Sequence, residues 1–222
     1  MRYDGGHKRD AFLTETLAPF VEWVPVCPEV ELGLGVPRDT LRLAGNARSP
    51  RPLVERTGED LTVRMQRFAR RRVQALGGLQ LDGFVLKRGS PSCGLLGVPV
   101  HRTSRAPRAA GRGLFAAALV THIPWLPVEE EGRLADPVLR EKFIERVFAM
   151  ARWRAFVAGP PRARDLVAFH ATQKSAVLTR SPAHYARLER LVASTGRLGR
   201  STLDEYGRLL MEALAVRAPR RS

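Results

Sequence analysis

Cysteine is scarce in this chain: of 222 residues only two are cysteine, Cys27 and Cys93. Two cysteines do not make the disulfide framework of a small secreted protein, so thiol or metal chemistry in a reducing compartment is favoured. Long hydrophobic runs are absent as well, which excludes a conventional transmembrane helix. Residues 1–10 are charged and glycine-rich and lack the apolar core of a signal peptide. The sequence therefore predicts a cytoplasmic protein that does not enter a membrane.

Negative charge is also in short supply, since 37 Lys and Arg oppose 22 Asp and Glu for a net charge of +15. The excess is uneven, with 18 basic and 8 acidic residues in 133–222 against 19 and 14 in 1–132. Such a balance favours a polyanionic partner, RNA or DNA first. The competing interpretation is compositional, because proteins from GC-rich genomes are similarly rich in Arg and Ala.

The first 135 residues alternate between helical and strand-like patterns. Helices are expected over 10–20, from 57–60 to Leu76 and over 114–122, and strands over 21–26 and 83–87. This alternation predicts an α/β domain, residues 1–135, with a mainly parallel sheet. Ligands of such sheets gather beyond the carboxyl ends of the strands. Cys27 and Cys93 each follow an apolar run, so we expect the two thiols to share one crevice.

From residue 136 onward the pattern is helical throughout. Helices are expected over 137–156, 165–178, 181–193 and 201–216, with a Gly-Pro-Pro linker at 159–161 and no strand after residue 133. Ser181-Pro182 is typical of a helix start, with serine as the N-cap and proline in the first turn. The sequence thus predicts an all-α second domain, residues 136–222, which is also the more basic part.

The two cysteines lie in turns. Cysteine is commonly buried as a small apolar side chain, so two unrelated core cysteines are one interpretation. However, Cys27 precedes Pro28, and Cys93 lies within Ser90–Gly94, where Pro and Gly favour exposed backbone. Exposed N–H groups favour the thiolate, the form that binds iron or zinc or attacks an electrophile. No CxxC or zinc spacing is present, so the pattern alone leaves the role open.

Several motifs resemble known families. RYDGGHKRD, VPVCPEVELGLGVPRDTLRL, TGED, SPSCG and GRGLFAAAL resemble the thiouracil desulfurase-type (TudS-like) family. Residues 167–174 (VAFHATQK) and 181–185 (SPAHY) resemble the YbgA-like helical family. Fusions of the two resemble tRNA 4-thiouridine desulfidases of the RudS type, and the resemblance covers nearly the whole chain.

The resemblance implies a [4Fe-4S] cluster held by three cysteines, with one iron open to take sulfur from a thiolated base. Cys27 and Cys93 match two of these ligands, and Glu29 and Ser90 match positions assigned to catalysis. A carboxylate can deliver a proton or activate water as C=S becomes C=O, and a serine hydroxyl can hydrogen-bond the base or the departing sulfur. Substrate-binding positions near the cluster are expected at Asp4, His7, Lys8 and Ser92.

Other polar residues are weaker candidates. His170 and Lys174 share a helical face, and with His184 they are expected to contact RNA, although a helical histidine is more often structural or solvated. The run Arg64–Arg72 is either a solvated face or a phosphate track. Glu129–Glu131 is expected to be a solvated acidic turn.

The family's first cysteine lies upstream of RYDGG, so we expect the third ligand to precede Met1, and the helical domain to continue beyond Ser222. The favoured function is desulfidation of 4-thiouridine in tRNA. One alternative is a desulfurase of free thiouracil or thiouridine whose helical domain serves oligomerisation. Another is a non-catalytic nucleic-acid-binding protein with a decayed cluster site.

Overall fold

The structure is a computed structural model that describes residues 3–6, 9–101, 109–195 and 198–216. The chain divides into two compact units. The N-terminal unit comprises Met1–Leu81, Val85–Pro124 and Val128–Ala135, and the helical unit comprises Asp82–Phe84, Trp125–Pro127 and Asp136–Ser222.

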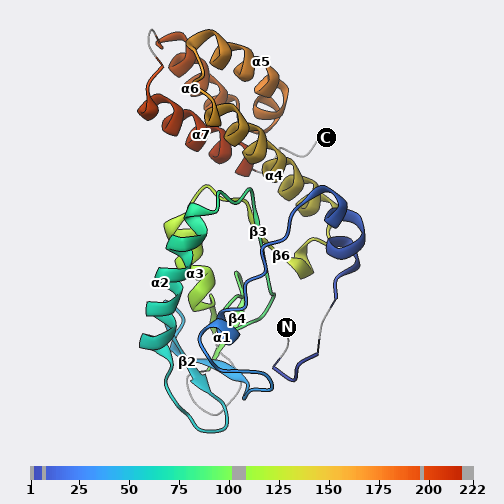
Figure 1. Ribbon diagram of the computed structural model, residues 1–222, viewed down its shortest axis with the longest axis vertical. Coiled ribbons are helices and arrows are strands. Elements are labelled where there is room, and N and C mark those ends of the chain that lie inside the picture. The colour runs from blue at the N-terminus through green and yellow to red at the C-terminus, as the bar shows by residue number, and fades with distance from the viewer. Residues whose placement is uncertain (1–2, 7–8, 102–108, 196–197, 217–222) are drawn as a thin grey trace. The chain divides into compact units, whose positions relative to one another are not determined.

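The N-terminal unit contains a four-stranded sheet in the order β2-β1-β4-β5 (Figure 1). Its strands are β1 (Leu41–Asn46), β2 (Ser49–Val54), β4 (Val98–His101) and β5 (Ala109–Gly111). β1 pairs with β4 in parallel, but the pairs β1–β2 and β4–β5 are antiparallel. The prediction of a mainly parallel sheet is therefore wrong for this four-stranded sheet. The reason is local, since a tight hairpin can join only antiparallel neighbours.

The hairpin of β1 and β2 was not expected from the sequence. β2 contains Pro50 and Pro52, which lack backbone N–H groups and weaken any strand prediction. They are tolerated because β2 lies at the edge of the sheet. Position in the sheet, which the local sequence does not reveal, thus decides this element.

Helices α2 (Thr62–Gly78) and α3 (Leu114–His122) confirm two of the expected helices and lie side by side (Figure 1). Their contact with the sheet forms a buried core of Leu43, Met65, Val98, Val100 and Leu114. This core sets the first turn of α3 against the sheet, where the segment containing Cys93 approaches it.

The segment before Cys27 differs from the expectation. Helical structure is present as a π-helix, η1 (Phe12–Leu17), and a 3-10 turn, η2 (Ala18–Phe20). The strand expected over 21–26 is absent, and Trp23 and Val24 are exposed. A β-rich composition did not suffice here, because a strand needs a partner ladder as well. The strand expected over 83–87 is confirmed as β3 (Phe84–Leu86), which pairs with β6 (Val128–Glu130) in a separate two-stranded sheet.

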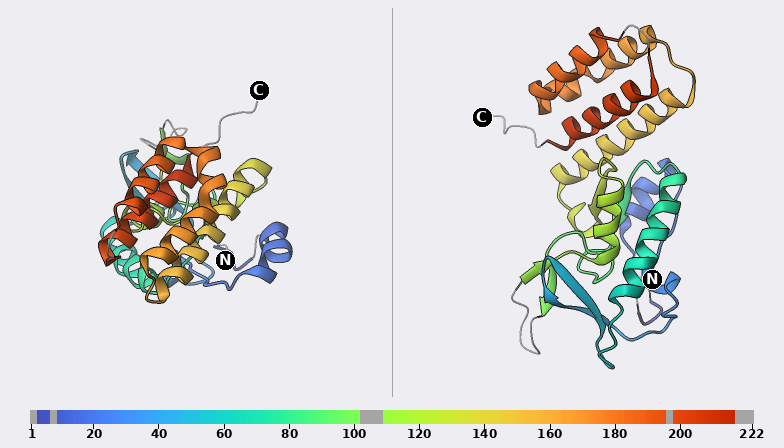
Figure 2. Two further views of the ribbon diagram at one scale, coloured as in Figure 1. Left: turned by 90° about the horizontal axis from the view of Figure 1, so that it is seen from above. Right: turned by 90° about the vertical axis from the view of Figure 1, so that its left-hand side faces the viewer.

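The helical unit confirms all four expected helices (Figure 2). They are α4 (Pro137–Ala158), α5 (Ala163–Arg180), α6 (Pro182–Ala193) and α7 (Arg200–Ala215). Asp136 caps α4 by accepting the N–H of Val138 at 2.8 Å, and Ser181 caps α6, as its Ser-Pro start predicts. No strand follows β6 in the part of the chain that the structure describes, and none of the described helices has the length and apolar content needed to cross a membrane.

The core of the helical unit is built around aromatic side chains. Trp153 stacks on Tyr206 with ring centroids 4.9 Å apart, and both are buried. Gly207 of α7 lies directly against this stack: a Cβ atom there would lie 2.2 Å from Nε1 of Trp153. Glycine is required because the indole ring occupies the space of any larger side chain.

We therefore expect Gly207→Ala to lower the free energy of unfolding by about 1–3 kcal/mol, since Trp153 must move out of its packed position. Urea denaturation followed by circular dichroism measures the change. Gly159→Ala is the matched control in the same unit, because its Cβ would meet no atom within 4 Å. Equal stability of the two variants would contradict the close packing of α7 on Trp153.

Candidate active site

The turn around Cys27 is held by a short helix. Cys27 is the N-cap of α1 (Pro28–Glu31), with Pro28 at its first position. The backbone N–H of Cys27 donates to the carboxylate of Glu31 at 3.2 Å. The Cys27 thiol is free and half-buried. This geometry fixes the backbone on both sides of the sulfur without enclosing it.

The turn Ser90–Gly94 is organised by the side chain of its first residue. The Ser90 hydroxyl oxygen accepts the N–H groups of Ser92 at 3.3 Å and Cys93 at 3.1 Å. The carbonyl of Ser90 accepts the N–H of Gly94 at 2.7 Å. Neither bond to the Ser90 oxygen uses the hydroxyl proton.

The same turn caps α3. The carbonyl of Ser92 accepts the N–H groups of Phe115 at 3.0 Å and Ala116 at 3.2 Å, groups that a helix start cannot satisfy internally. A Cβ on Gly113 would lie 2.3 Å from the Ser92 carbonyl oxygen, so only glycine permits this approach. The glycine of the GRG motif is therefore explained by the position of the cysteine turn.

The two cysteine turns meet through a carboxylate. The buried Ser92 hydroxyl donates a short hydrogen bond to Oε1 of Glu29, across 63 positions of sequence. Nε of Arg38 donates to Oε2 of Glu29 at 2.8 Å, and the side chains of Arg38 and Glu29 are only 5% and 14% exposed. Glu29 is thus held by one bond on each oxygen. The predicted residues that the structure brings together are Cys27, Glu29, Ser90, Ser92 and Cys93.

Arg38 is a site residue that sequence reasoning missed. It lies in the VPRDT stretch, and the available signal was that a functional carboxylate in a partly buried turn requires a partner. Its backbone N–H also donates to the carbonyl of Tyr3 at 2.9 Å, which ties the RYDGG segment to the site. In that segment Asp4 accepts the N–H of Gly6 at 2.9 Å. The predicted substrate-binding residues His7 and Lys8 lie outside the described residues.

Electrostatics keep the Cys93 thiol protonated in the metal-free protein. Burial, followed by the charges of Glu29 and Cys27, raises the pKa of Cys93 far above its ordinary value, and the Ser90 hydrogen bond only partly offsets this. A bound cation reverses this balance, because a coordinating thiol is deprotonated.

Sulfur donors of this kind suit an iron–sulfur cluster. Both cysteines are unbridged, and each is presented by a turn. Among the residues that the structure describes, however, no group of three or more His, Cys, Asp or Glu is arranged to hold a metal ion. The described site therefore fits a cluster as two of its ligands.

The residues expected to contact RNA do not lie in equivalent environments. Lys174 is exposed, and His184 is half-buried with its Nδ1 2.8 Å from the Ser181 hydroxyl. His170 is buried in the helical core: its Nδ1 lies 3.1 Å from the Tyr206 hydroxyl, and its ring stacks on Tyr185 at 5.0 Å. The burial of His170 does not fit the predicted contact with RNA. Lys174 and His184 are accessible, and their contacts with RNA stay predictions.

Burial, opposed by Glu189 and reinforced by Lys174, lowers the pKa of His170 below its ordinary value. Below pH about 6.5 the unfolded chain takes up a proton that the folded chain does not, so the free energy of unfolding falls as pH decreases. We expect a slope of at most about 1.4 kcal/mol per pH unit, measured by urea denaturation between pH 8 and pH 5. His170→Gln should remove this component, and His184→Gln, the control in the same unit, should retain it. A wild-type slope that persists in His170→Gln would assign the effect to another group.

The family comparison agrees with the motifs of the N-terminal part. The family described as 2-thiouracil desulfurase matches residues 1–131. A solved structure, the [4Fe-4S]-dependent thiouracil desulfidase TudS (DUF523Vcz), matches at 27% sequence identity over 60% of this chain and 84% of that chain, with a TM-score of 0.47. A comparison with curated proteins gave no match. Because the family match spans more than half of the 222 residues, the chain belongs to the 2-thiouracil desulfurase family.

Proposed function

We propose that this protein is a desulfidase that converts C=S to C=O in 4-thiouridine of tRNA, using a [4Fe-4S] cluster. The observation that carries the proposal is the hydrogen bond from Ser92 to Glu29. It joins the turn of Cys27 to the turn of Cys93 through a carboxylate. Family membership supports the same reaction class, since the matching family is described as 2-thiouracil desulfurase.

Cys27 and Cys93 would hold the cluster, with a third ligand expected from the family pattern. When bound, the cluster supplies an iron that accepts the thiocarbonyl sulfur. The net reaction exchanges that sulfur for the oxygen of water and releases hydrogen sulfide, so no electrons are gained or lost. The protein's own residues then need only to orient the base, activate water and move protons.

Glu29 is suited to the proton-transfer role. Ser92 donates to one of its oxygens and Arg38 to the other, so the carboxylate keeps one orientation. A carboxylate held in this way can take a proton from water as the oxygen attacks carbon and return a proton to the leaving sulfur. Ser90, whose oxygen already holds the cysteine turn, can donate its hydroxyl proton to the base.

The helical unit offers a surface for tRNA. A groove between α6 and α7 is lined by Arg187, Arg190, Leu191, Ala193, Ser194, Glu205 and Leu209. Arg187 and Arg190 are exposed, and neither forms an ion pair with a carboxylate of the described residues. Guanidinium groups of this kind bind phosphate oxygens and release counterions from RNA. The groove therefore supports binding of the substrate through its backbone.

The activity test uses protein reconstituted anaerobically with iron and sulfide. We expect loss of the thiobase from 4-thiouridine-containing tRNA, measured by nucleoside chromatography. Glu29→Gln should lower turnover by about 100- to 10,000-fold, because the positioned proton acceptor is lost. Glu55→Gln, an exposed glutamate of the same unit, is the matched control and should keep activity. Cys27→Ala and Cys93→Ala should lose iron as well as activity.

The outcomes separate the alternatives. If the enzyme desulfidates free thiouracil or free 4-thiouridine but leaves the thiobase of tRNA unchanged, the substrate is the free base or nucleoside and not tRNA. Iron-loaded protein that leaves all three substrates unchanged would refute the desulfidase. Protein that binds tRNA but takes up no iron would favour the non-catalytic interpretation.

Binding to tRNA is tested by filter binding as a function of salt. The double variant Arg187→Gln/Arg190→Gln should weaken binding and reduce the slope of log K against log salt by about 2, because two phosphate contacts are lost. Arg51→Gln/Arg56→Gln carries the same charge change in the N-terminal unit, where both arginines are ion-paired. If this control weakens binding equally, the net charge rather than the groove holds the RNA.

A further inference from the structure

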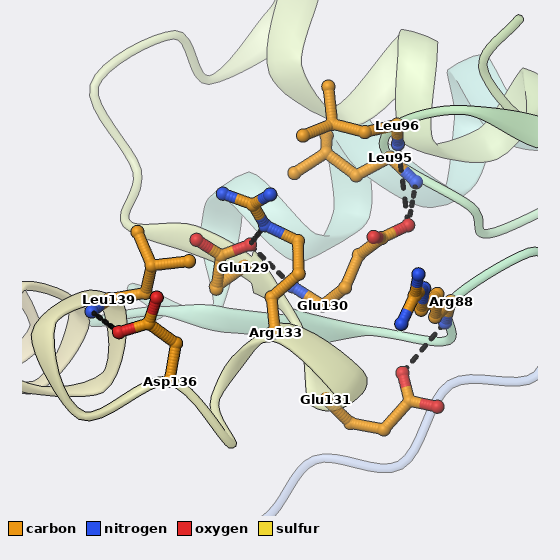
Figure 3. Close-up of polar contacts among 9 residues, drawn as sticks. All are labelled: Arg88, Leu95, Leu96, Glu129, Glu130, Glu131, Arg133, Asp136 and Leu139. Carbon is orange, nitrogen blue, oxygen red and sulfur yellow. Dashed lines mark hydrogen bonds and ion pairs between the residues drawn. The ribbon is translucent and has the colours of Figure 1, made fainter. Parts of the chain in front are cut away.

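Glu129, Glu130 and Glu131 do not form the solvated acidic turn that was expected. Each carboxylate has a specific partner (Figure 3). Glu129 accepts from Nε of Arg133 at 2.8 Å and from the N–H of its own neighbour at 3.0 Å. Glu130 and Glu131 instead bind segments that lie 34 to 44 positions earlier in the chain. The prediction of a solvated turn is wrong because two of the three side chains bind distant backbone.

Glu130 is 1% exposed, which is unusual for a glutamate. Its Oε1 accepts the backbone N–H of Leu95 at 2.7 Å and that of Leu96 at 3.3 Å. Burying a carboxylate is costly unless hydrogen bonds compensate it. The two N–H groups provide that compensation. The same bonds fix the backbone directly after Gly94.

Glu131 holds the chain on the other side of the same turn. Its Oε2 accepts the N–H of Arg88 at 2.7 Å, and its Oε1 pairs with Nζ of Lys87. Burial opposes ionisation, but the bonds from Lys87 and Arg88 prevail and lower the pKa of Glu131. Gly132 permits the close approach, since a Cβ there would lie 2.9 Å from Cδ of Arg88.

These contacts lie on both sides of the turn Ser90–Gly94. Lys87 and Arg88 precede it, Leu95 and Leu96 follow it, and the residues that hold them are adjacent in sequence. We infer that Glu130 and Glu131 are positioning residues that together clamp the two ends of the turn and so fix the place of the Cys93 sulfur. The inference rests on the proposed function only in taking Cys93 as a cluster ligand.

The clamp acts on the flanks of the turn and adds to the bonds that Ser92 makes with Glu29 and with the start of α3. Within the turn, the Ser90 hydroxyl and carbonyl supply the hydrogen bonds to Ser92, Cys93 and Gly94. A ligand or catalytic group must be held to within about 0.5 Å, which a short loop achieves only with support from outside. Two carboxylates bonded to backbone N–H groups supply that support independently of which side chains the loop carries.

The test measures the thiols of the metal-free protein, with no substrate present. Folded protein is treated with iodoacetamide, and alkylation of Cys93 and Cys27 is followed separately by peptide mass spectrometry. In Glu130→Ala and in Glu131→Ala we expect the rate ratio of Cys93 to Cys27 to rise about tenfold, because the turn that holds the half-buried Cys93 sulfur opens while the Cys27 turn does not. Hydrogen exchange of the Leu95 and Leu96 amides should accelerate in Glu130→Ala.

Two variants separate positioning from general stability. Glu130→Gln keeps an oxygen that can accept both N–H groups, so it should restore the wild-type ratio. Glu129→Ala removes a carboxylate of the same triplet whose bonds stay within its own segment, so it should leave the ratio unchanged. If Glu130→Ala does not fold, Glu131→Ala still decides the question, since its carboxylate lies nearer the surface.

An unchanged ratio in folded Glu131→Ala, or an equal rise in Glu129→Ala, would overturn the clamp. Neither result bears on desulfidase activity. Conversely, the wild-type protein could lack desulfidase activity while Cys93 becomes more reactive in Glu130→Ala. That result would support the clamp and refute only the proposed function.

Discussion

The hydrogen bond from Ser92 to Glu29 is the contact on which the site depends. Through its hydroxyl Ser92 joins the two cysteine turns, and through its carbonyl it caps α3. One buried residue thus links a short helix, a turn and the start of a packed helix. Gly113 makes this possible, because any side chain there would displace the Ser92 carbonyl. Because α3 packs on the sheet through Leu114, the cysteine turn that caps α3 is fixed relative to the sheet.

Around this contact, buried charge is compensated in two different ways. Glu29 is paired with the buried guanidinium of Arg38, whereas Glu130 is held by backbone N–H groups. The first arrangement fixes both oxygens of a carboxylate beside the cysteine turns, and the second binds the backbone that follows the Cys93 turn. Both follow from the same constraint, since an ionised group out of water must be bonded or must lose its charge.

The sequence analysis expected the two cysteine turns to meet, but for a reason that the structure does not bear out. Two turns that each follow an apolar run were expected to approach each other beyond a parallel sheet, yet in the four-stranded sheet only β1 and β4 pair in parallel. The two cysteine turns come together because Ser92 of the Cys93 turn donates a hydrogen bond to Glu29 of α1. Arg38 escaped notice since nothing local marks an arginine as the partner of a carboxylate nine positions away. His170 was placed on an RNA-binding face because helical spacing does not reveal which face is buried.

Local patterns alone determined the helices after residue 136, the family and the turn residues of the site. Helix starts are encoded within a few residues by Asp136 and by Ser181-Pro182, and the family by contiguous motifs such as SPSCG. Only the tertiary structure decided the direction of the strands, the burial of His170 and the roles of Glu130 and Glu131. Each of these depends on a partner distant in sequence. The same three glutamates are compatible with a solvated acidic run and with a buried clamp, and only the position of the backbone N–H groups that they bind distinguishes the two.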